Sequence, residues 1–158
     1  MRSASITAAF SVMTVLAACG GPEPEATTTQ AQPDHASSMD IGDHVVHFSA
    51  QRTDQLPPEI ASLYNIVRSE NRAMLNVSVI EEATRKPVPA RVDVKTVNLT
   101  GQLKTINMRR IDEEEAIYYV GETPVANRET LIFDISVQPE GVEEPTQLRF
   151  KRQFFTDR

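Results

Sequence analysis

The segment AMLNVSV, residues 73–79, decides the fold class, because apolar and polar side chains alternate along it. Successive side chains of a β-strand point to opposite faces of the sheet, so this alternation predicts a strand with one buried face. One face carries Ala73, Leu75, Val77 and Val79, and the other face carries Met74, Asn76 and Ser78.

Six further segments carry short apolar alternations separated by turn residues. They span residues 45–50, 92–96, 103–111, 116–122, 131–137 and 148–154. Segments 103–111 and 116–122 predict a hairpin. The acidic tip of this hairpin, residues 112–115, could in principle attract calcium. A calcium site, however, needs about six or more oxygen ligands held by a shaped loop, so we expect the tip to be solvated instead. Seven short strands predict an all-β fold, a two-sheet antiparallel sandwich over residues 40–158.

One helical insert is expected at residues 56–64, LPPEIASLY. Proline suits the first turn of a helix, where a missing N–H costs no hydrogen bond. At helical spacing, Ile60, Leu63 and Tyr64 fall on one face.

The N-terminal residues 1–18 have the parts of an export signal: Arg2, a short apolar core, and small residues before Cys19, the one cysteine of the chain. The stretch LAAC at 16–19 is similar to a bacterial lipobox. That resemblance implies cleavage before Cys19 and lipidation of this residue on its sulfur and on the new amino terminus. Because one acyl chain anchors only marginally, stable retention on a membrane needs two or more.

Residues 19–39 predict the lipidated cysteine and a flexible tether, since they are rich in Pro, Thr, Gln and Ser and lack apolar periodicity. A random coil of about 20 residues reaches on the order of 25 Å. Gly20 follows the cysteine, where an aspartate would resemble an inner-membrane retention signal. We therefore expect a lipid anchor in the inner leaflet of the outer membrane, with the folded part facing the periplasm.

The charge balance argues against a nucleic-acid partner. The 158 residues carry 22 acidic and 16 basic side chains, a formal net charge of −6, without a long Lys/Arg cluster. No run of about 18 strongly apolar residues occurs, so no transmembrane helix is expected. Neither a phosphate loop, a dinucleotide fingerprint nor a nucleophile elbow is present, and no cofactor is predicted.

Several motifs resemble a family of small bacterial exported proteins and lipoproteins that is classed as a domain of unknown function. They are VHF at 46–48, LPPE at 56–59, RSENRA at 68–73, NLTGQ at 98–102 and FFTD at 154–157. The turn and strand RKPVPARVDV at 85–94 is similar to that of immunoglobulin-like modules. The resemblance implies a seven-stranded immunoglobulin-like β-sandwich in the periplasm of a Gram-negative organism, and it implies no activity.

Two groups of residues are candidates for binding. His44 and His47 are three apart, which on a strand places them on opposite faces, so the pair predicts no metal site. We expect His44 to be solvated and His47 to be half-buried, and His47 stays a candidate binding residue. Arg68, Asn71 and Arg72, between the helix and the next strand, form either an anion or partner site or simple ion pairs.

Three functions are compatible with these observations. The leading hypothesis is a non-enzymatic binding or adaptor module at the cell envelope, held to the membrane through Cys19 and recruiting an envelope protein. The alternatives are periplasmic copper or zinc handling through His47 and a nonlocal ligand, and a small envelope hydrolase that uses two carboxylates. The lack of a catalytic motif favours the first hypothesis over the hydrolase.

Overall fold

The structure, a computed structural model, describes residues 30–31 and 37–156. The export signal predicted for residues 1–18, the lipidation predicted at Cys19 and most of the predicted tether lie outside the described residues. Among the described residues, no helix has the length and apolar content needed to cross a membrane.

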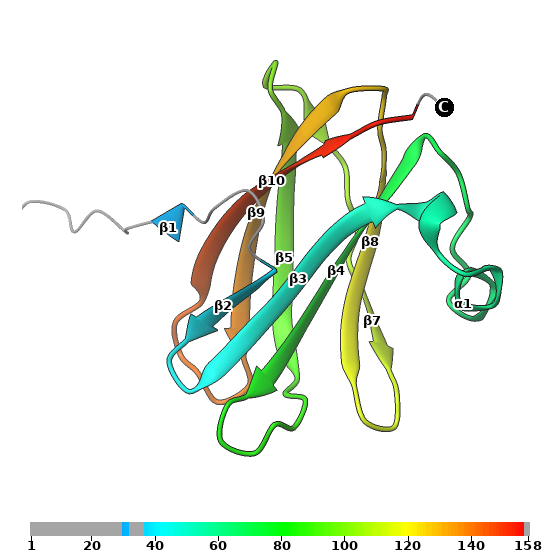
Figure 1. Ribbon diagram of the computed structural model, residues 1–158. Coiled ribbons are helices and arrows are strands. Elements are labelled where there is room, and N and C mark those ends of the chain that lie inside the picture. Colours follow the sequence, from blue (N-terminus) through cyan, green and yellow to red (C-terminus); the bar gives the residue numbers. More distant parts are fainter. Residues whose placement is uncertain (1–29, 32–36, 157–158) are drawn as a thin grey trace, which may run out of the picture.

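Two β-sheets face each other and form a sandwich (Figure 1). In one sheet the strand order is β1-β10-β9-β5-β6, and in the other it is β2-β3-β4-β8-β7. The first sheet consists of β1 (Gln30–Ala31), β10 (Thr146–Phe154), β9 (Glu129–Pro139), β5 (Ala90–Asn98) and β6 (Leu103–Lys104). The second consists of β2 (Ser38–Ile41), β3 (His44–Arg52), β4 (Arg72–Glu81), β8 (Ile117–Pro124) and β7 (Arg109–Asp112).

The strand order is that of an immunoglobulin-like sandwich. With β3 as strand A, the strands β4, β5, β7, β8, β9 and β10 become B to G, and β6 is an extra strand beside C. One sheet then reads A-B-E-D and the other carries C-F-G, which is the constant-type immunoglobulin arrangement. All pairings are antiparallel except the short parallel contact of β1 with β10. The predicted all-β sandwich is therefore confirmed.

The core lies between the two sheets and contains the alternating side chains that the sequence pattern marks as buried. Leu75 and Val77 of β4 face Phe133 and Ile135 of β9, and all four are fully buried. The ring of Phe150 stacks on that of Phe133 at 4.9 Å between centroids and is tilted against Phe48 at 4.8 Å. Aromatic rings packed in this way add to the stability gained from burial alone.

The described residues form ten strands where the sequence pattern predicts seven. The segment predicted as one strand at 103–111 is split, because β6 pairs with β5 in one sheet and β7 pairs with β8 in the other. Two short strands, β1 and β2, were not predicted, since two and four residues are too few to show an alternation. The strand β2 begins at Ser38, two residues inside the predicted tether.

The helical insert consists of a 3-10 turn η1 (Thr53–Gln55) and the helix α1 (Pro58–Leu63). It lies on the outer face of the β2-β3-β4-β8-β7 sheet, away from the other sheet (Figure 1). The predicted helical face is wrong in one position, because Leu63 is 66% exposed whereas Ala61 is buried. Ala61 packs with Leu56 and Ile66 against the sheet, so the two loops that flank the helix supply most of the contact.

Candidate functional site

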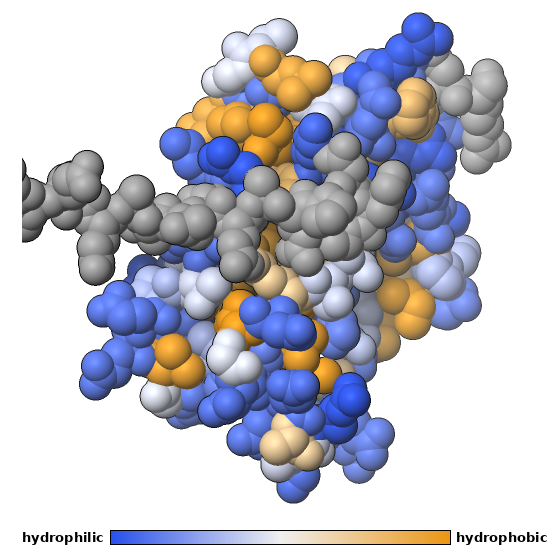
Figure 2. All heavy atoms as spheres, turned by 60° about the vertical axis from the view of Figure 1, so that its left-hand side comes forward, coloured by the Kyte–Doolittle hydropathy of each residue, from blue (hydrophilic) through white to orange (hydrophobic). Residues whose placement is uncertain are grey.

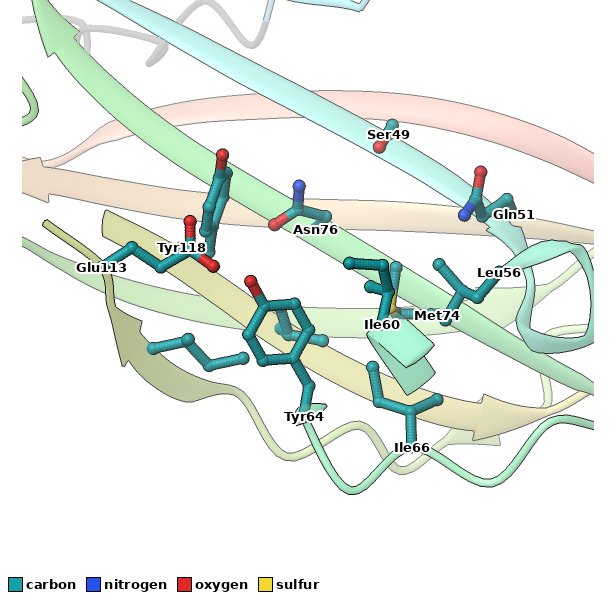
Figure 3. A pocket seen from close by; sticks show the side chains of 12 residues that line it. Ser49, Gln51, Leu56, Ile60, Tyr64, Ile66, Met74, Asn76, Glu113 and Tyr118 are labelled. Atoms are coloured by element: carbon teal, nitrogen blue, oxygen red, sulfur yellow. The ribbon is translucent and has the colours of Figure 1, made fainter. Parts of the chain in front are cut away.

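A pocket of about 430 Å³ opens between the insert and the outer face of the sheet, and we call it the insert pocket. Figure 3 shows side chains from both elements directed into it. The insert contributes Leu56, Ile60, Tyr64 and Ile66; the sheet and its hairpin contribute Ser49, Gln51, Met74, Asn76, Ile111, Glu113, Tyr118 and Val120.

The pocket lies over two strands that carry some buried apolar side chains on their outer face as well as on the core face. Met74 of β4 and Val120 of β8 point outward, away from the core, yet both are buried. On a solvated sheet face these positions would be polar. The insert covers them and forms a second small apolar cluster, but it does not fill the space between Tyr64 and Tyr118.

A few polar groups are set among the apolar walls. Asn76 lies opposite Val120 in the β4–β8 register, which places it diagonally next to Tyr118 on the same face. The Asn76 Oδ1 atom is buried and accepts no hydrogen bond from any described residue. Ser49 and Gln51 of β3 lie at the side of the pocket (Figure 3). Apolar walls with few polar groups are typical of ligand pockets.

The insert is held in place by hydrogen bonds at its ends. The fully buried Thr53 donates its hydroxyl hydrogen to the carbonyl of Val67 at 2.8 Å and accepts from the backbone N–H of Ser69 at 2.9 Å. Arg109 of β7 donates to the carbonyl of Tyr64 from the opposite side. The walls of the pocket are therefore fixed to each other by polar contacts outside the pocket.

A smaller hollow of about 290 Å³ lies between the end of β3 and the end of β10. It is lined by Arg52 and Arg152 together with three glutamines and two phenylalanines. The guanidinium of Arg52 already pairs with Asp54 at 3.0 Å and donates to the carbonyl of Phe155. Because this cation already forms an ion pair within the fold and the hollow is the smaller of the two, it is a weaker candidate than the insert pocket.

The residues that the sequence marked as binding candidates do not gather at one place. His47 pairs with Ser78 in the β3–β4 register, six residues from Arg72, or about 20 Å along the strand. His47 is exposed and His44 is partly buried, the reverse of the predicted burial, because residues at even positions of β3 face the core. No group of three or more metal-ligating side chains forms among the described residues.

The cluster between helix and strand serves the local fold. Arg68 donates to the backbone carbonyl of Asp54 at 2.7 Å, and Arg72 pairs with Glu122 at 3.6 Å. The backbone carbonyl of Asn71 accepts from Val125 at 3.0 Å. Neither these three residues nor His47 line the insert pocket.

Sequence reasoning missed Tyr64, Asn76, Glu113 and Tyr118 as pocket residues. One signal was present: the segment IYYV at 117–120 is apolar at outward as well as inward positions, and an outward apolar position needs a cover. By contrast, hydrophilic side chains predominate on the side of the molecule that carries β2, and apolar ones gather there only in separate patches (Figure 2).

Comparison with known proteins places the fold within a family. The model for a domain of unknown function, DUF4426, matches residues 38–157. The match confirms the resemblance indicated by the sequence motifs. Among proteins with curated annotation, none matches the chain.

Two solved structures are similar over most of their length. A DUF4426 family protein from Pseudomonas aeruginosa PAO1, in a crystal structure at 2.09 Å resolution, is 35% identical, with a TM-score of 0.67 over 77% of this chain and 95% of that chain. FetP of uropathogenic E. coli strain F11, recombinantly expressed in the periplasm of E. coli BL21(DE3), is 8% identical, with a TM-score of 0.53. The match covers 75% of this chain and 92% of that chain. The second likeness shows a shared fold alone.

Proposed function

The chain belongs to the DUF4426 family, and on this premise we propose that it is a non-enzymatic binding module that recruits an envelope protein through its insert pocket. The observation that carries the proposal is the pocket itself. Its volume of about 430 Å³ falls within the range of roughly 300 to 1,000 Å³ in which ligand sites occur. This is enough space for one large apolar side chain of a partner.

The proposal includes a location at the cell envelope. The LAAC stretch before Gly20 supports lipidation of Cys19 and retention at the inner leaflet of the outer membrane. Because β1 already pairs residues 30–31 with β10, about ten residues separate Cys19 from the sandwich, and as a random coil they would reach on the order of 15–20 Å. A module held at this distance can meet other envelope proteins.

The chemistry of the pocket supports binding rather than catalysis. Among the described residues that line it, Glu113 supplies the one carboxylate, and no histidine is present. Hydrolysis of a glycosidic bond ordinarily needs two carboxyl groups, and a serine nucleophile needs a base beside it. Ser49, the one serine of the pocket, has neither a histidine nor a lysine beside it in the lining.

Partner capture with a pocket variant tests the proposal. Tyr64→Ala removes one wall of the pocket, and Leu63→Ala is a matched control, since Leu63 is adjacent, 66% exposed and outside the pocket lining. Full-length chains are cross-linked in membranes, and captured proteins are quantified by mass spectrometry. We expect a protein captured by the wild type to be reduced at least about tenfold with Tyr64→Ala and unchanged with Leu63→Ala.

Two outcomes would refute the proposal. Equal capture by the wild type and Tyr64→Ala would show that the pocket does not hold the partner. Loss of capture with Leu63→Ala but not with Tyr64→Ala would place the contact on the outer surface of the insert instead. Urea denaturation of each variant establishes that the sandwich stays folded under the conditions of capture.

A further inference from the structure

One side of the insert pocket is bounded by an acidic hairpin tip, residues 112–115, which connects β7 to β8. Its four side chains are Asp112, Glu113, Glu114 and Glu115, and all four are exposed. Glu113 also lines the pocket, so the hairpin places negative charge directly beside an apolar hollow.

Most of this negative charge has no ion-pair partner among the described residues. Asp112 pairs with Arg110 at 2.6 Å, whereas Glu113, Glu114 and Glu115 form no ion pair with any described residue. Near the pocket, Arg109 donates to the neutral carbonyl of Tyr64 and keeps its charge, whereas Arg110 and Arg72 pair with Asp112 and Glu122. Three carboxylates therefore face solvent next to the opening.

We infer that the partner presents an apolar side chain flanked by lysines or arginines, so that the side chain enters the insert pocket while the cations meet the hairpin tip. This inference rests on the proposed function and adds the chemistry of the partner to it. Complementary charge at the rim of an interface fixes orientation and raises the association rate, and salt weakens it. A partner whose apolar side chain is flanked by acidic residues would be repelled by the same three carboxylates.

Asn76, which lines the pocket, indicates what the side chain should carry. Its side-chain amide supplies a carbonyl acceptor, so an occupant with an N–H donor can pair with it at this wall of the pocket. Tryptophan combines an apolar ring with one N–H donor. Because the chain has no tryptophan, the fluorescence of a tryptophan-containing probe reports on the probe alone.

Three capped, fluorescein-labelled pentapeptides test the inference: KKWKK, EEWEE and KKAKK. Their binding to the full-length chain in non-ionic detergent is measured by fluorescence anisotropy at 50 and 300 mM NaCl, and unlabelled KKWKK is followed by its tryptophan emission. We expect KKWKK to bind at least about tenfold more tightly than either other peptide. The higher salt should weaken it, and its emission should shift to the blue as the ring leaves water.

Charge-neutralising variants separate the hairpin from the net charge of the molecule. Glu113→Gln/Glu114→Gln should weaken binding of KKWKK on the order of tenfold at low salt. The control Glu143→Gln/Glu144→Gln removes the same charge from the turn between β9 and β10, in the other sheet, and should leave binding unchanged. Equal weakening by both variants would mean that only net charge matters and would overturn the inference.

Other results would also overturn it. One is that EEWEE or KKAKK binds as tightly as KKWKK. Another is that the dissociation constant of KKWKK is weaker than about 1 mM. The proposed function would survive each of these results if the Tyr64→Ala and Leu63→Ala variants still differ in partner capture. The two proposals can therefore fail separately.

Discussion

Thr53 shows how one hydroxyl can fix a whole insert. The side chain is fully buried, at the start of η1; its hydroxyl donates to the carbonyl of Val67 and accepts from the N–H of Ser69. These partners follow the insert in sequence, so Thr53 joins its beginning to its end. The position of Leu56, Tyr64 and Ile66 against the sheet depends on this closure.

Replacement of Thr53 by valine should therefore loosen the insert. The variant keeps the shape of the side chain but removes the partner of the Val67 carbonyl and of the Ser69 N–H, two partly buried hydrogen bonds that are expected to contribute about 0.5–1.5 kcal/mol each. Urea denaturation should show this loss in the free energy of unfolding. Thr53→Ser retains the hydroxyl and should lose less than Thr53→Val. Equal losses would mean that the methyl contacts, and not the hydrogen bonds, hold the insert.

Glu129, at the start of β9, is the second residue on which the local fold depends. Its carboxylate accepts from Lys104 of β6, from Asn98 of β5 at 3.0 Å and from the N–H of Ala126 at 2.8 Å. Burial raises the pKa of this carboxyl, but these hydrogen bonds and the charge of Lys104 outweigh it and lower the pKa below its ordinary value of 4.5. The ionised form therefore stabilises the fold.

The stability contribution of Glu129 should depend on pH with a definite sign. A lowered pKa gives stability that is complete above the unfolded value near 4.5 and is lost as the pH falls through the lower folded value. Glu129→Gln should lower the free energy of unfolding at pH 7 by about 1–3 kcal/mol. The difference from the wild type should shrink on acidification below about pH 5.

Unfolding titrations in urea at pH 7, 5 and 3.5 would measure this effect. Asp134→Asn is a suitable comparison, because it breaks the ion pair with Arg149, which is more exposed than the pair of Glu129 with Lys104. The free energy of unfolding should fall by less than about 1 kcal/mol in this variant. A difference between wild type and Glu129→Gln that stayed constant from pH 7 to 3.5 would contradict the lowered pKa.

At the scale of elements, the strands that alternate clearly could be predicted from the sequence. The strands β3, β4, β5, β8, β9 and β10 bury one set of alternate side chains, as the pattern requires. Where a segment changes sheets, the pattern fails: Leu103 and Ile111 belong to different sheets although both are apolar. Alternation reports which face is buried and does not report which sheet the strand joins.

The crossing between β6 and β7 depends on a glycine in another strand. Ile106 and Met108 pass over Gly121 of β8, where an added Cβ would lie 2.7 Å from Ile106 Cγ1 and 2.6 Å from Met108 Sδ. The backbone carbonyl of Asn107 would be 3.2 Å away. A glycine here lets the connection between the sheets pack closely on β8.

Gly121→Ala should therefore destabilise the sandwich, although alanine ordinarily suits a strand better than glycine. Overpacking of this kind costs about 1–3 kcal/mol, since Ile106 and Met108 must move. Thermal denaturation followed by circular dichroism would show a lower midpoint than for the wild type. Glu122→Ala, at the next position of the same strand but on its outer face, should change the midpoint much less. A midpoint for Gly121→Ala at or above that of the wild type would show that the crossing has room for a methyl group.

At the scale of the whole molecule, the architecture was predictable and the site was not. Alternate side chains point into the core in each of the long strands, so a local sequence pattern is enough to predict the core residues. The insert pocket combines Ser49, Tyr64, Asn76 and Tyr118, which come from three strands and a loop and meet only in the folded chain. The residues that looked functional, Arg68 and Arg72, are charged and lie close together in sequence, yet their partners are Asp54 and Glu122 of the same fold.

We predict that the location of the whole molecule depends on lipidation of Cys19, and this prediction can be tested without knowing a partner. If Cys19 is lipidated, the full-length chain should be recovered in the membrane pellet after cell fractionation, and mass spectrometry should find acyl chains on residue 19. Each buried methylene contributes about 0.8 kcal/mol, so two or three acyl chains hold the protein firmly on the membrane. Cys19→Ala should abolish the modification and release any exported chain from the pellet, while His35→Ala, in the tether, should change neither. An unmodified residue 19 in the wild type, or a Cys19→Ala chain that has lost residues 1–18 and still stays in the membrane fraction, would contradict lipid anchoring and would require a different way for the sandwich to meet an envelope partner.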